Sequence, residues 1–197
     1  MKNILKIAAV FSLSAGTALA GGYSEPVAEP VIPVAPMVDA DWGGFYAGLG
    51  YAGFFGEADY GSDYEFKDTA NPMLFAGYRL DKGKLVYGLE LAASFGDVWE
   101  DGYTDSYGVT ALYDLKASLG YDMGKFLPYI SLGYSFGDYM FSGNDGYDMD
   151  GYLVGLGFDY AINDKFTAGL SYDYRDMDVD GVDVNLQSVA LKLAYTF

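Results

Sequence analysis

Residues 188–197 read SVALKLAYTF, with an apolar side chain at every second position and small or polar residues between. An alternation with period two is typical of a β-strand that has one apolar and one polar face. Two details need an explanation. A lysine, Lys192, stands on the small and polar face, and the sequence stops on a bulky phenylalanine. The apolar positions are Val189, Leu191, Leu193, Tyr195 and Phe197.

The same alternation recurs seven more times from Trp42 onward, and each stretch has a face of larger residues and a face of smaller ones. In the fourth stretch, for example, Val109, Ala111 and Tyr113 share the larger face and Thr110 lies on the smaller one. A tilted strand needs roughly 9–11 residues to cross a bilayer, and each stretch is long enough. The sequence therefore predicts eight strands, each able to span a membrane.

The connections between these stretches alternate in length. Three are tight turns with the sequences DKGK (81–84), DMGK (122–125) and NDK (163–165). The other four are longer and rich in Gly and Asp. Short turns at one end and long loops at the other are typical of an outer-membrane barrel, with the turns in the periplasm and the loops outside.

Charge is sorted between the two faces. The larger faces carry no charge within the spans, so a continuous apolar belt is expected to face outward, which only lipid makes favourable. The fold class predicted is an all-β, eight-stranded antiparallel up-and-down transmembrane β-barrel over residues 42–197. The smaller faces carry four basic and four acidic residues: Arg79, Lys116, Arg175, Lys192, Glu90, Asp114, Asp159 and Asp173.

These eight charges are predicted to face a narrow lumen, where an unpaired ion would be costly and a paired one tolerable. Lys192 should therefore reach an acid. Asp173 is the nearest candidate by strand order, and Glu90 and Asp114 are alternatives across the interior. Because an eight-stranded barrel is only wide enough inside for side chains, we expect a neutral plug. A conduction path lined by the same charges is the alternative.

The four longer connections account for nearly all of the net charge of −17. One of them, DMDVDGVDVNLQ (176–187), begins like a calcium-binding loop but has Gln187 where the bidentate Glu should stand. We therefore expect these loops to attract divalent cations diffusely. The acidic residues are Glu57, Asp59, Asp63, Glu65, Asp68, Asp97, Glu100, Asp101, Asp105, Asp138, Asp145, Asp148, Asp150, Asp176, Asp178, Asp180 and Asp183.

The N-terminal segments are expected to lie outside the barrel. Residues 1–20 have a basic start, an apolar centre and an A-x-A exit, and they read as a secretory signal peptide. Residues 21–41 hold four of the six prolines and read as an extended periplasmic leader. The chain has no Cys and no His, and its acidity excludes nucleic acid as a partner.

The opening DWGGFYAGLGYAG (41–53) and the closing LKLAYTF (191–197) resemble the first and last strands of the small eight-stranded outer-membrane barrels of Gram-negative bacteria, the outer-membrane protein A-like and porin-family surface antigens. The resemblance implies that the alternating C-terminus ending in Phe197 is an insertion signal read by the barrel-assembly machinery. It does not imply peptidoglycan anchoring, because the sequence stops at the barrel. Barrels of this size that modify lipid A use a His, so no enzyme and no cofactor are expected.

Taken together, these features predict a structural, surface-presenting protein of the cell outer membrane. We expect a monomer that contacts outer-membrane lipid and lipopolysaccharide, with no catalytic or metal site. Two alternatives remain: a small-solute or ion channel, and an adhesin or receptor that acts through the loops.

Overall fold

The computed structural model describes residues 40–59, 63–99, 107–141 and 144–197. The expected signal peptide (1–20) and residues 21–39 of the expected leader lie outside the described residues. The described part contains no helix that could cross a membrane. The strands are β1 (Gly44–Asp59), β2 (Asp63–Glu65), β3 (Thr69–Asp81), β4 (Leu85–Ser94), β5 (Val98–Trp99), β6 (Tyr107–Tyr121), β7 (Phe126–Phe141), β8 (Asn144–Ala161), β9 (Phe166–Val179) and β10 (Val182–Thr196).

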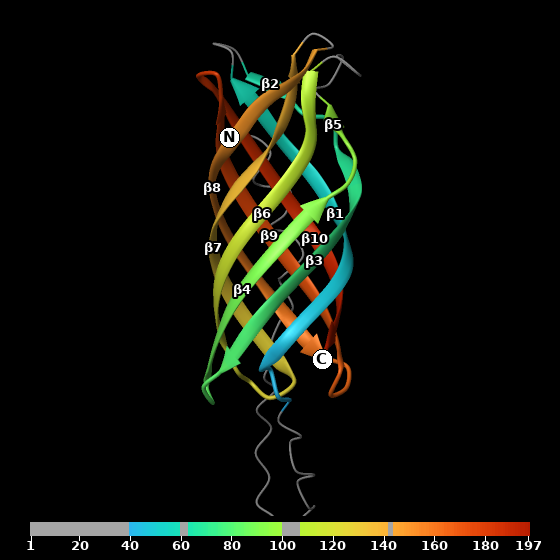
Figure 1. The fold of residues 1–197 in the computed structure, drawn as a ribbon, viewed down its shortest axis with the longest axis vertical. Coiled ribbons are helices and arrows are strands. Elements are labelled where there is room, and N and C mark those ends of the chain that lie inside the picture. The colour runs from blue at the N-terminus through green and yellow to red at the C-terminus, as the bar shows by residue number, and fades with distance from the viewer. Residues whose placement is uncertain (1–39, 60–62, 100–106, 142–143) are drawn as a thin grey trace, which may run out of the picture. The chain divides into compact units, whose positions relative to one another are not determined.

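The eight long strands form a closed barrel (Figure 1). They pair in the order β1, β3, β4, β6, β7, β8, β9, β10, each antiparallel to its neighbours, and β10 pairs with β1 to close the sheet. The closing seam runs from the pair Tyr46–Thr196 to the pair Asp59–Asp183. The short strands β2 and β5 add to β1 and β6. The predicted fold class is confirmed.

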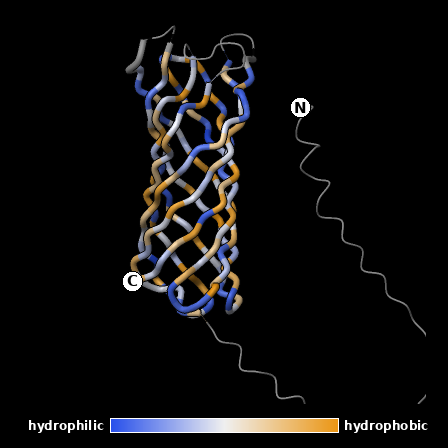
Figure 2. The backbone as a smooth tube through the Cα atoms, turned by 90° about the vertical axis from the view of Figure 1, so that its right-hand side faces the viewer, coloured by the Kyte–Doolittle hydropathy of each residue, from blue (hydrophilic) through white to orange (hydrophobic). Residues whose placement is uncertain are grey.

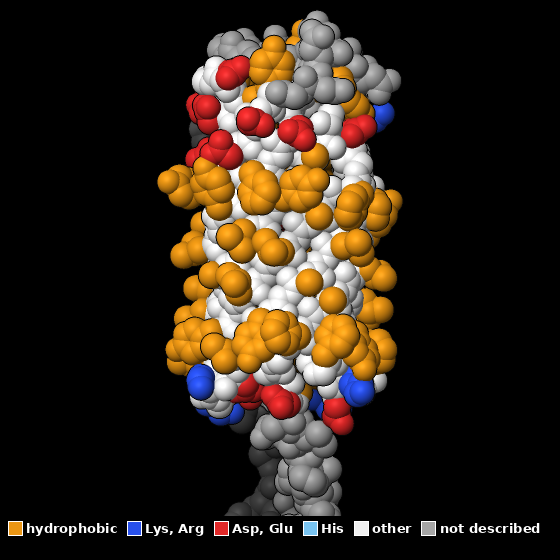
Figure 3. Space-filling model, viewed as in Figure 1, with side chains coloured by type: hydrophobic (Ala, Val, Ile, Leu, Met, Phe, Trp, Pro, Cys, Tyr) orange, Lys and Arg blue, Asp and Glu red, His pale blue; other side chains and the backbone are white. Residues whose placement is uncertain are grey.

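Alternation along each strand places the larger residues outside. On β1, Phe45 is 67% exposed and its neighbour Tyr46 is 4% exposed. Hydrophobic and hydrophilic positions are accordingly interspersed along the visible strands of the tube in Figure 2. The outer surface carries two bands of aromatic side chains with smaller apolar residues between them (Figure 3), as expected for a barrel that crosses a lipid bilayer.

The two ends of the barrel differ. The end that holds the three short turns, the start of β1 and the C-terminus is called the turn end, and the opposite end is the loop end. The strands continue further toward the loop end than the sequence suggested: β7 has 16 residues and β8 has 18, more than a bilayer requires. Many residues expected in loops therefore belong to strands.

The fourth long connection differs most clearly from the sequence-based expectation of a loop. Strands β9 and β10 are joined by a two-residue turn at Asp180 and Gly181, whose φ angles of 51° and 82° fit a type I′ hairpin. Along β9 beside it, Asp176 and Asp178 are exposed while Met177 and Val179 are buried. The residues that resemble a calcium-binding loop therefore lie in a flat hairpin, which cannot wrap around an ion.

A second correction concerns Val109. The sequence placed it on the outward face of β6 together with Ala111, but it is 2% exposed and packs inside the barrel. The pairing of β6 with β7 shifts register between Val109 and Ala111. Such a β-bulge inserts one extra residue and reverses the side-chain parity beyond it, so Val109 points inward.

Candidate functional site: ion pairs across the lumen

The eight charged residues expected in the lumen all lie on inward faces and are buried. Strand alternation positions them, because each occupies the parity of the small residues on its strand. They come from six strands: Arg79 on β3, Glu90 on β4, Asp114 and Lys116 on β6, Asp159 on β8, Asp173 and Arg175 on β9, and Lys192 on β10.

Six of them form a chain of alternating sign that begins on the closing strand. The Nζ of Lys192 donates to both carboxylate oxygens of Glu90 at 2.7 Å. Glu90 also lies 3.2 Å from the Nζ of Lys116, which in turn lies 3.4 Å from Asp173. Strand β10 is thereby tied to β4, and β6 to β9, across the interior.

The chain ends at a bidentate pair. Arg175 donates from Nε and Nη2 to the two oxygens of Asp114 at 3.0 and 2.7 Å, and its Nη2 lies 3.9 Å from Asp173. Its Nη1 donates to Ser188, and Ser135 donates to Asp114 at 2.6 Å. This end of the chain is therefore well satisfied, as buried ions must be.

The remaining two charges form a separate pair. Arg79 on β3 contacts Asp159 on β8, so this pair also spans the lumen. The guanidinium lies 4.4 Å from the ring centre of Tyr46, whose hydroxyl donates to Glu90 at 2.9 Å. Tyr46 therefore connects the isolated pair to the six-membered chain.

Lys192 does not pair with Asp173, the nearest acid by strand order. Register explains this, because Asp173 is paired with Ser188 and Lys192 with Gly169. Four residues along a strand correspond to about 13 Å. Asp173 therefore lies closer to the loop end and serves Lys116 and Arg175 instead.

Glycines on β8 make room for bulky polar side chains of the neighbouring strands β7 and β9. A Cβ at Gly155 would overlap Oδ1 of Asp173 and Oγ of Ser131, and a Cβ at Gly157 would lie 2.6 Å from the hydroxyl of Tyr129. These small inward-facing residues are thus required where a larger polar side chain on the adjacent strand leans over them.

Apolar layers lie on both sides of the ions. At the turn end, Trp42, Val86, Leu127 and Ala161 pack together in one layer. Toward the loop end lies a larger apolar core inside the projecting strands. That core includes Ala52, Phe54, Phe66, Met73, Val98, Val109, Leu112, Tyr139, Met149, Met177, Val179, Val184 and Leu186.

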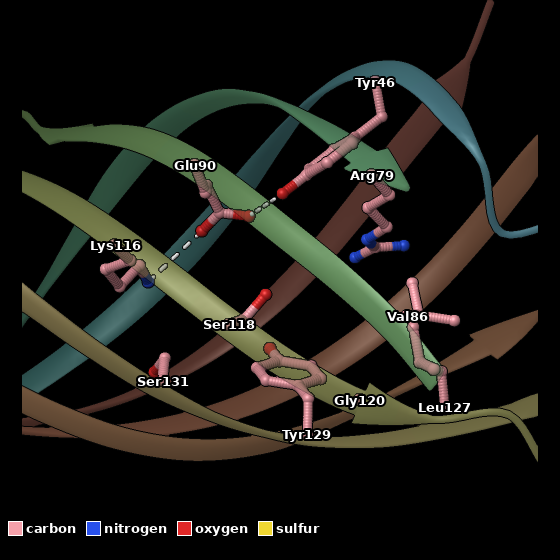
Figure 4. Close-up of a pocket in the computed structure, with 10 residues that line it drawn as sticks. All are labelled: Tyr46, Arg79, Val86, Glu90, Lys116, Ser118, Gly120, Leu127, Tyr129 and Ser131. Carbon is pink, nitrogen blue, oxygen red and sulfur yellow. Dashed lines mark hydrogen bonds and ion pairs between the residues drawn. The ribbon is translucent and has the colours of Figure 1, made fainter. Parts of the chain in front are cut away.

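A small polar cavity of about 20 Å³ lies between the turn-end layer and the ion chain (Figure 4). In the close-up, Glu90 lies between Lys116 and Tyr46, and Val86 and Leu127 stand at one side. By volume it accommodates one or two water molecules. Its lining residues are Tyr46, Arg79, Val86, Glu90, Lys116, Ser118, Gly120, Leu127, Tyr129 and Ser131.

The outer surface at the loop end is acidic, with carboxylates gathered above the upper aromatic band (Figure 3). Four exposed aspartates face one another across neighbouring strands, as the pairs Asp150–Asp178, Asp178–Asp183 and Asp183–Asp59. Like charges in directly opposed positions destabilise a sheet. Within the described ranges, no group of three or more acidic side chains is arranged to hold a metal ion.

The five residues expected to form an assembly signal lie on the closing strand or just beyond it. Val189, Leu191 and Leu193 are exposed toward the membrane side, and Phe197 is 80% exposed. The backbone N–H of Phe197 donates to the carbonyl of Phe45 at 3.0 Å, which extends the seam beyond β10. The ring of Tyr195 packs edge-on against Phe197 at 5.2 Å.

The apolar core of the loop end and the contacts of Trp42 and Tyr46 were not predicted from the sequence. A signal for the core was present: Met149 lies between Asp148 and Asp150, and DMDVD (176–180) alternates acid with apolar residue. That alternation is the pattern of a strand with a buried face and a solvated face. Trp42 precedes β1, so no period could reveal its position.

Comparisons with known proteins agree with this architecture. The sequence model described as outer membrane protein beta-barrel domain matches residues 27–197. The 22 kDa outer membrane protein of Rhizobium leguminosarum bv. viciae is 33% identical over 158 residues, 78% of this chain and 72% of that protein. The 25 kDa outer-membrane immunogenic protein of Brucella canis is 27% identical, covering 100% of this chain and 99% of that protein.

Two solved structures share the fold at low sequence identity. Neisserial surface protein A has a TM-score of 0.54 and 20% identity, covering 78% of this chain and 97% of its own. Ail, the attachment invasion locus protein of Yersinia pestis, has a TM-score of 0.53 and 17% identity, covering 77% of this chain and 98% of its own.

Proposed function

Since this chain belongs to the outer membrane protein beta-barrel domain family, we propose that it is a structural and surface-presenting protein whose lumen is closed to ions and solutes. The barrel is located in the outer membrane, as its relatives are. The function is then to occupy the membrane and to display the loop end at the cell surface, with the turn end in the periplasm.

The observation that carries this proposal is the chain of ion pairs between two apolar layers. The six-membered chain from Lys192 to Asp114 leaves no charge of one sign in excess, and the pair of Arg79 with Asp159 is also neutral. A hydrated ion would have to separate these pairs and then cross an apolar core, and both steps cost several kcal/mol. This arrangement favours a plug over the channel alternative.

The displayed surface is acidic and is built largely on strands. Side chains of Asp59, Asp150, Asp178 and Asp183 project from paired strands above the aromatic band, so their geometry is fixed by the sheet. The Brucella relatives are named immunogenic, which supports exposure of such a surface. Adhesion or receptor activity at this end is the alternative function, and diffuse association with divalent cations belongs to the same proposal.

The remaining parts of the proposal concern partners. The outward apolar belt would contact lipid and lipopolysaccharide, and the barrel-assembly machinery would read the C-terminal strand. The protein would act as a monomer without a cofactor and without enzymatic activity, since all eight lumen charges engage one another and the chain contains no His.

Recordings from planar bilayers test the closed lumen. The refolded, heat-modifiable barrel is expected to give no discrete conductance steps in 1 M salt, while a known porin in the same membranes gives them. Reproducible single-channel conductance steps from this protein would contradict the closed lumen and support the channel alternative. If the protein gave no conductance but bound to cells, the adhesin alternative would be favoured instead.

A further inference from the structure

The polar cavity below the ion chain is lined by polar groups that have room for further hydrogen bonds. The hydroxyl-bearing residues Ser118, Tyr129 and Ser131 line it, and Arg79, which also lines it, binds its acid through Nη2. Lys116 approaches its two acids at 3.2 and 3.4 Å, longer than the 2.7 Å between Lys192 and Glu90. Buried polar groups are nearly always satisfied by protein or by ordered water.

The acceptor that lines the cavity is already occupied. Glu90 receives Lys192 on both oxygens, Tyr46 on Oε2 and Lys116 near Oε1. The other polar groups around the cavity are donors and hydroxyl groups, which suit a small molecule that both accepts and donates hydrogen bonds. With about 20 Å³ available, that molecule has the size of water.

The cavity is separated from the turn end by a single apolar layer. Three members of that layer, Val86, Leu127 and Ala161, are held in strands. The fourth, Trp42, precedes β1 and is not part of the sheet. On the other side, the ion chain and the loop-end core separate the cavity from the opposite mouth.

Trp42 is held by its packing in this layer and by two hydrogen bonds, not by strand pairing. Its Nε1 donates to the carbonyl of Gly124 at 3.1 Å, and its backbone N–H donates to Asp81 at 3.3 Å. Its ring lies 5.7 Å from the guanidinium of Arg79, which lines the cavity. Although it is 3% exposed, Trp42 can leave without breaking a strand pair.

We propose that the cavity is a hydration site for one or two water molecules and that it exchanges with solvent at the turn end past Trp42. Trp42 acts as a gate at the turn end, whereas the loop end stays closed. This inference rests on the proposed closed lumen. It adds that the two ends of the lumen differ, because small polar molecules reach the ion pairs from the turn end but do not pass on to the loop end.

The absence of cysteine from the chain allows a direct test. Ser118→Cys places a thiol on the cavity, and Leu112→Cys places a matched thiol in the loop-end core, also on β6. Each is made with Trp42 intact and with Trp42→Ala, refolded, checked for heat-modifiable migration, and treated with a small charged methanethiosulfonate reagent. Tryptic mass spectrometry follows the rate of modification.

Ser118→Cys is expected to react slowly when Trp42 is present and about tenfold faster or more with Trp42→Ala, which corresponds to about 1.4 kcal/mol in the free energy of opening. Leu112→Cys should stay unreactive in both. An unchanged rate of modification at Ser118→Cys would contradict the role of Trp42 as a gate, but it would leave the proposal of a closed lumen intact. Reaction at Leu112→Cys would instead contradict the closed lumen.

Trp42→Phe provides a second variant if Trp42→Ala does not fold. It keeps an apolar ring but removes the hydrogen bond to Gly124. The rate at Ser118→Cys should rise by a smaller factor than with Trp42→Ala. No rise in this variant would overturn the inference by itself.

Discussion

The Nζ of Lys192 lies 2.7 Å from both carboxylate oxygens of Glu90, although 102 residues separate them in the chain. Lys192 belongs to β10, the strand that closes the barrel, and Glu90 projects from β4. These two strands are not paired in the sheet. The Nζ also lies 4.2 Å from the ring centre of Phe75 on β3. Closure of the sheet is thus coupled to a buried contact across its interior.

Replacing Lys192 by Met should therefore destabilise the barrel. The change leaves the carboxylate of Glu90 buried with fewer partners, and removing one member of a buried pair typically costs about 3–5 kcal/mol. The urea midpoint of refolded protein in lipid should fall accordingly. Combining Lys192→Met with Glu90→Gln should restore part of the loss, because the double variant buries no unpaired carboxylate at this position.

The control for this series is Lys67→Met, an exposed lysine near the loop end, for which a change within about 0.5 kcal/mol is expected. If Lys192→Met left the midpoint unchanged but produced ion conductance, the lumen charges would line a path instead of stabilising a plug.

The C-terminal residue should matter for assembly more than for the folded barrel. Deleting Phe197, or replacing it with Asp, removes an exposed aromatic side chain. The deletion also removes the backbone N–H that continues the seam to Phe45. We expect much less heat-modifiable protein in the outer-membrane fraction of cells. The comparison variant is Asp180→Asn, because Asn tolerates the positive φ of 51° at this turn. Normal assembly without Phe197 would argue against an insertion signal.

The orientation of the barrel can be read with single cysteines. Asp148→Cys lies at the loop end and Lys82→Cys in the first short turn, and both positions are exposed. A bulky maleimide that does not cross the outer membrane should label Asp148→Cys on intact cells, and should label Lys82→Cys after permeabilisation alone. Labelling of Lys82→Cys on intact cells would reverse the topology that we propose.

The opposed aspartates at the loop end should weaken the barrel at low salt. Asp183 faces Asp178 on one side and Asp59 on the other. Asp183→Asn removes both repulsions, each worth about 0.2–1 kcal/mol, and should raise the urea midpoint. The gain should shrink as salt screens exposed charges. Asp164→Asn in a short turn serves as the control, and an equal effect there would show that net charge alone is responsible.

Local pattern was sufficient to predict the strands and their faces. Period-two alternation needs no knowledge of neighbours, so the inward position of Arg79, Glu90 and Lys192 could be inferred from their parity along the strand. The same local pattern misled at Val109, because a bulge depends on how β6 meets β7. It also misplaced the acidic stretch 176–183, where Gly and Asp suggested a loop and the structure continues the strands.

The sequence by itself determined that eight amphipathic strands turn their apolar faces to lipid and their balanced charges inward, because alternation and charge sorting are properties of each strand alone. The partner of each ion was decided by the tertiary structure. Strand register sets which side chains share a level in the barrel, and it places Lys192 opposite Glu90 while Asp173 lies four residues further along β9. The position of Trp42 over the turn end was decided in the same way, since it depends on where β3 and the β6–β7 turn meet around the closed sheet.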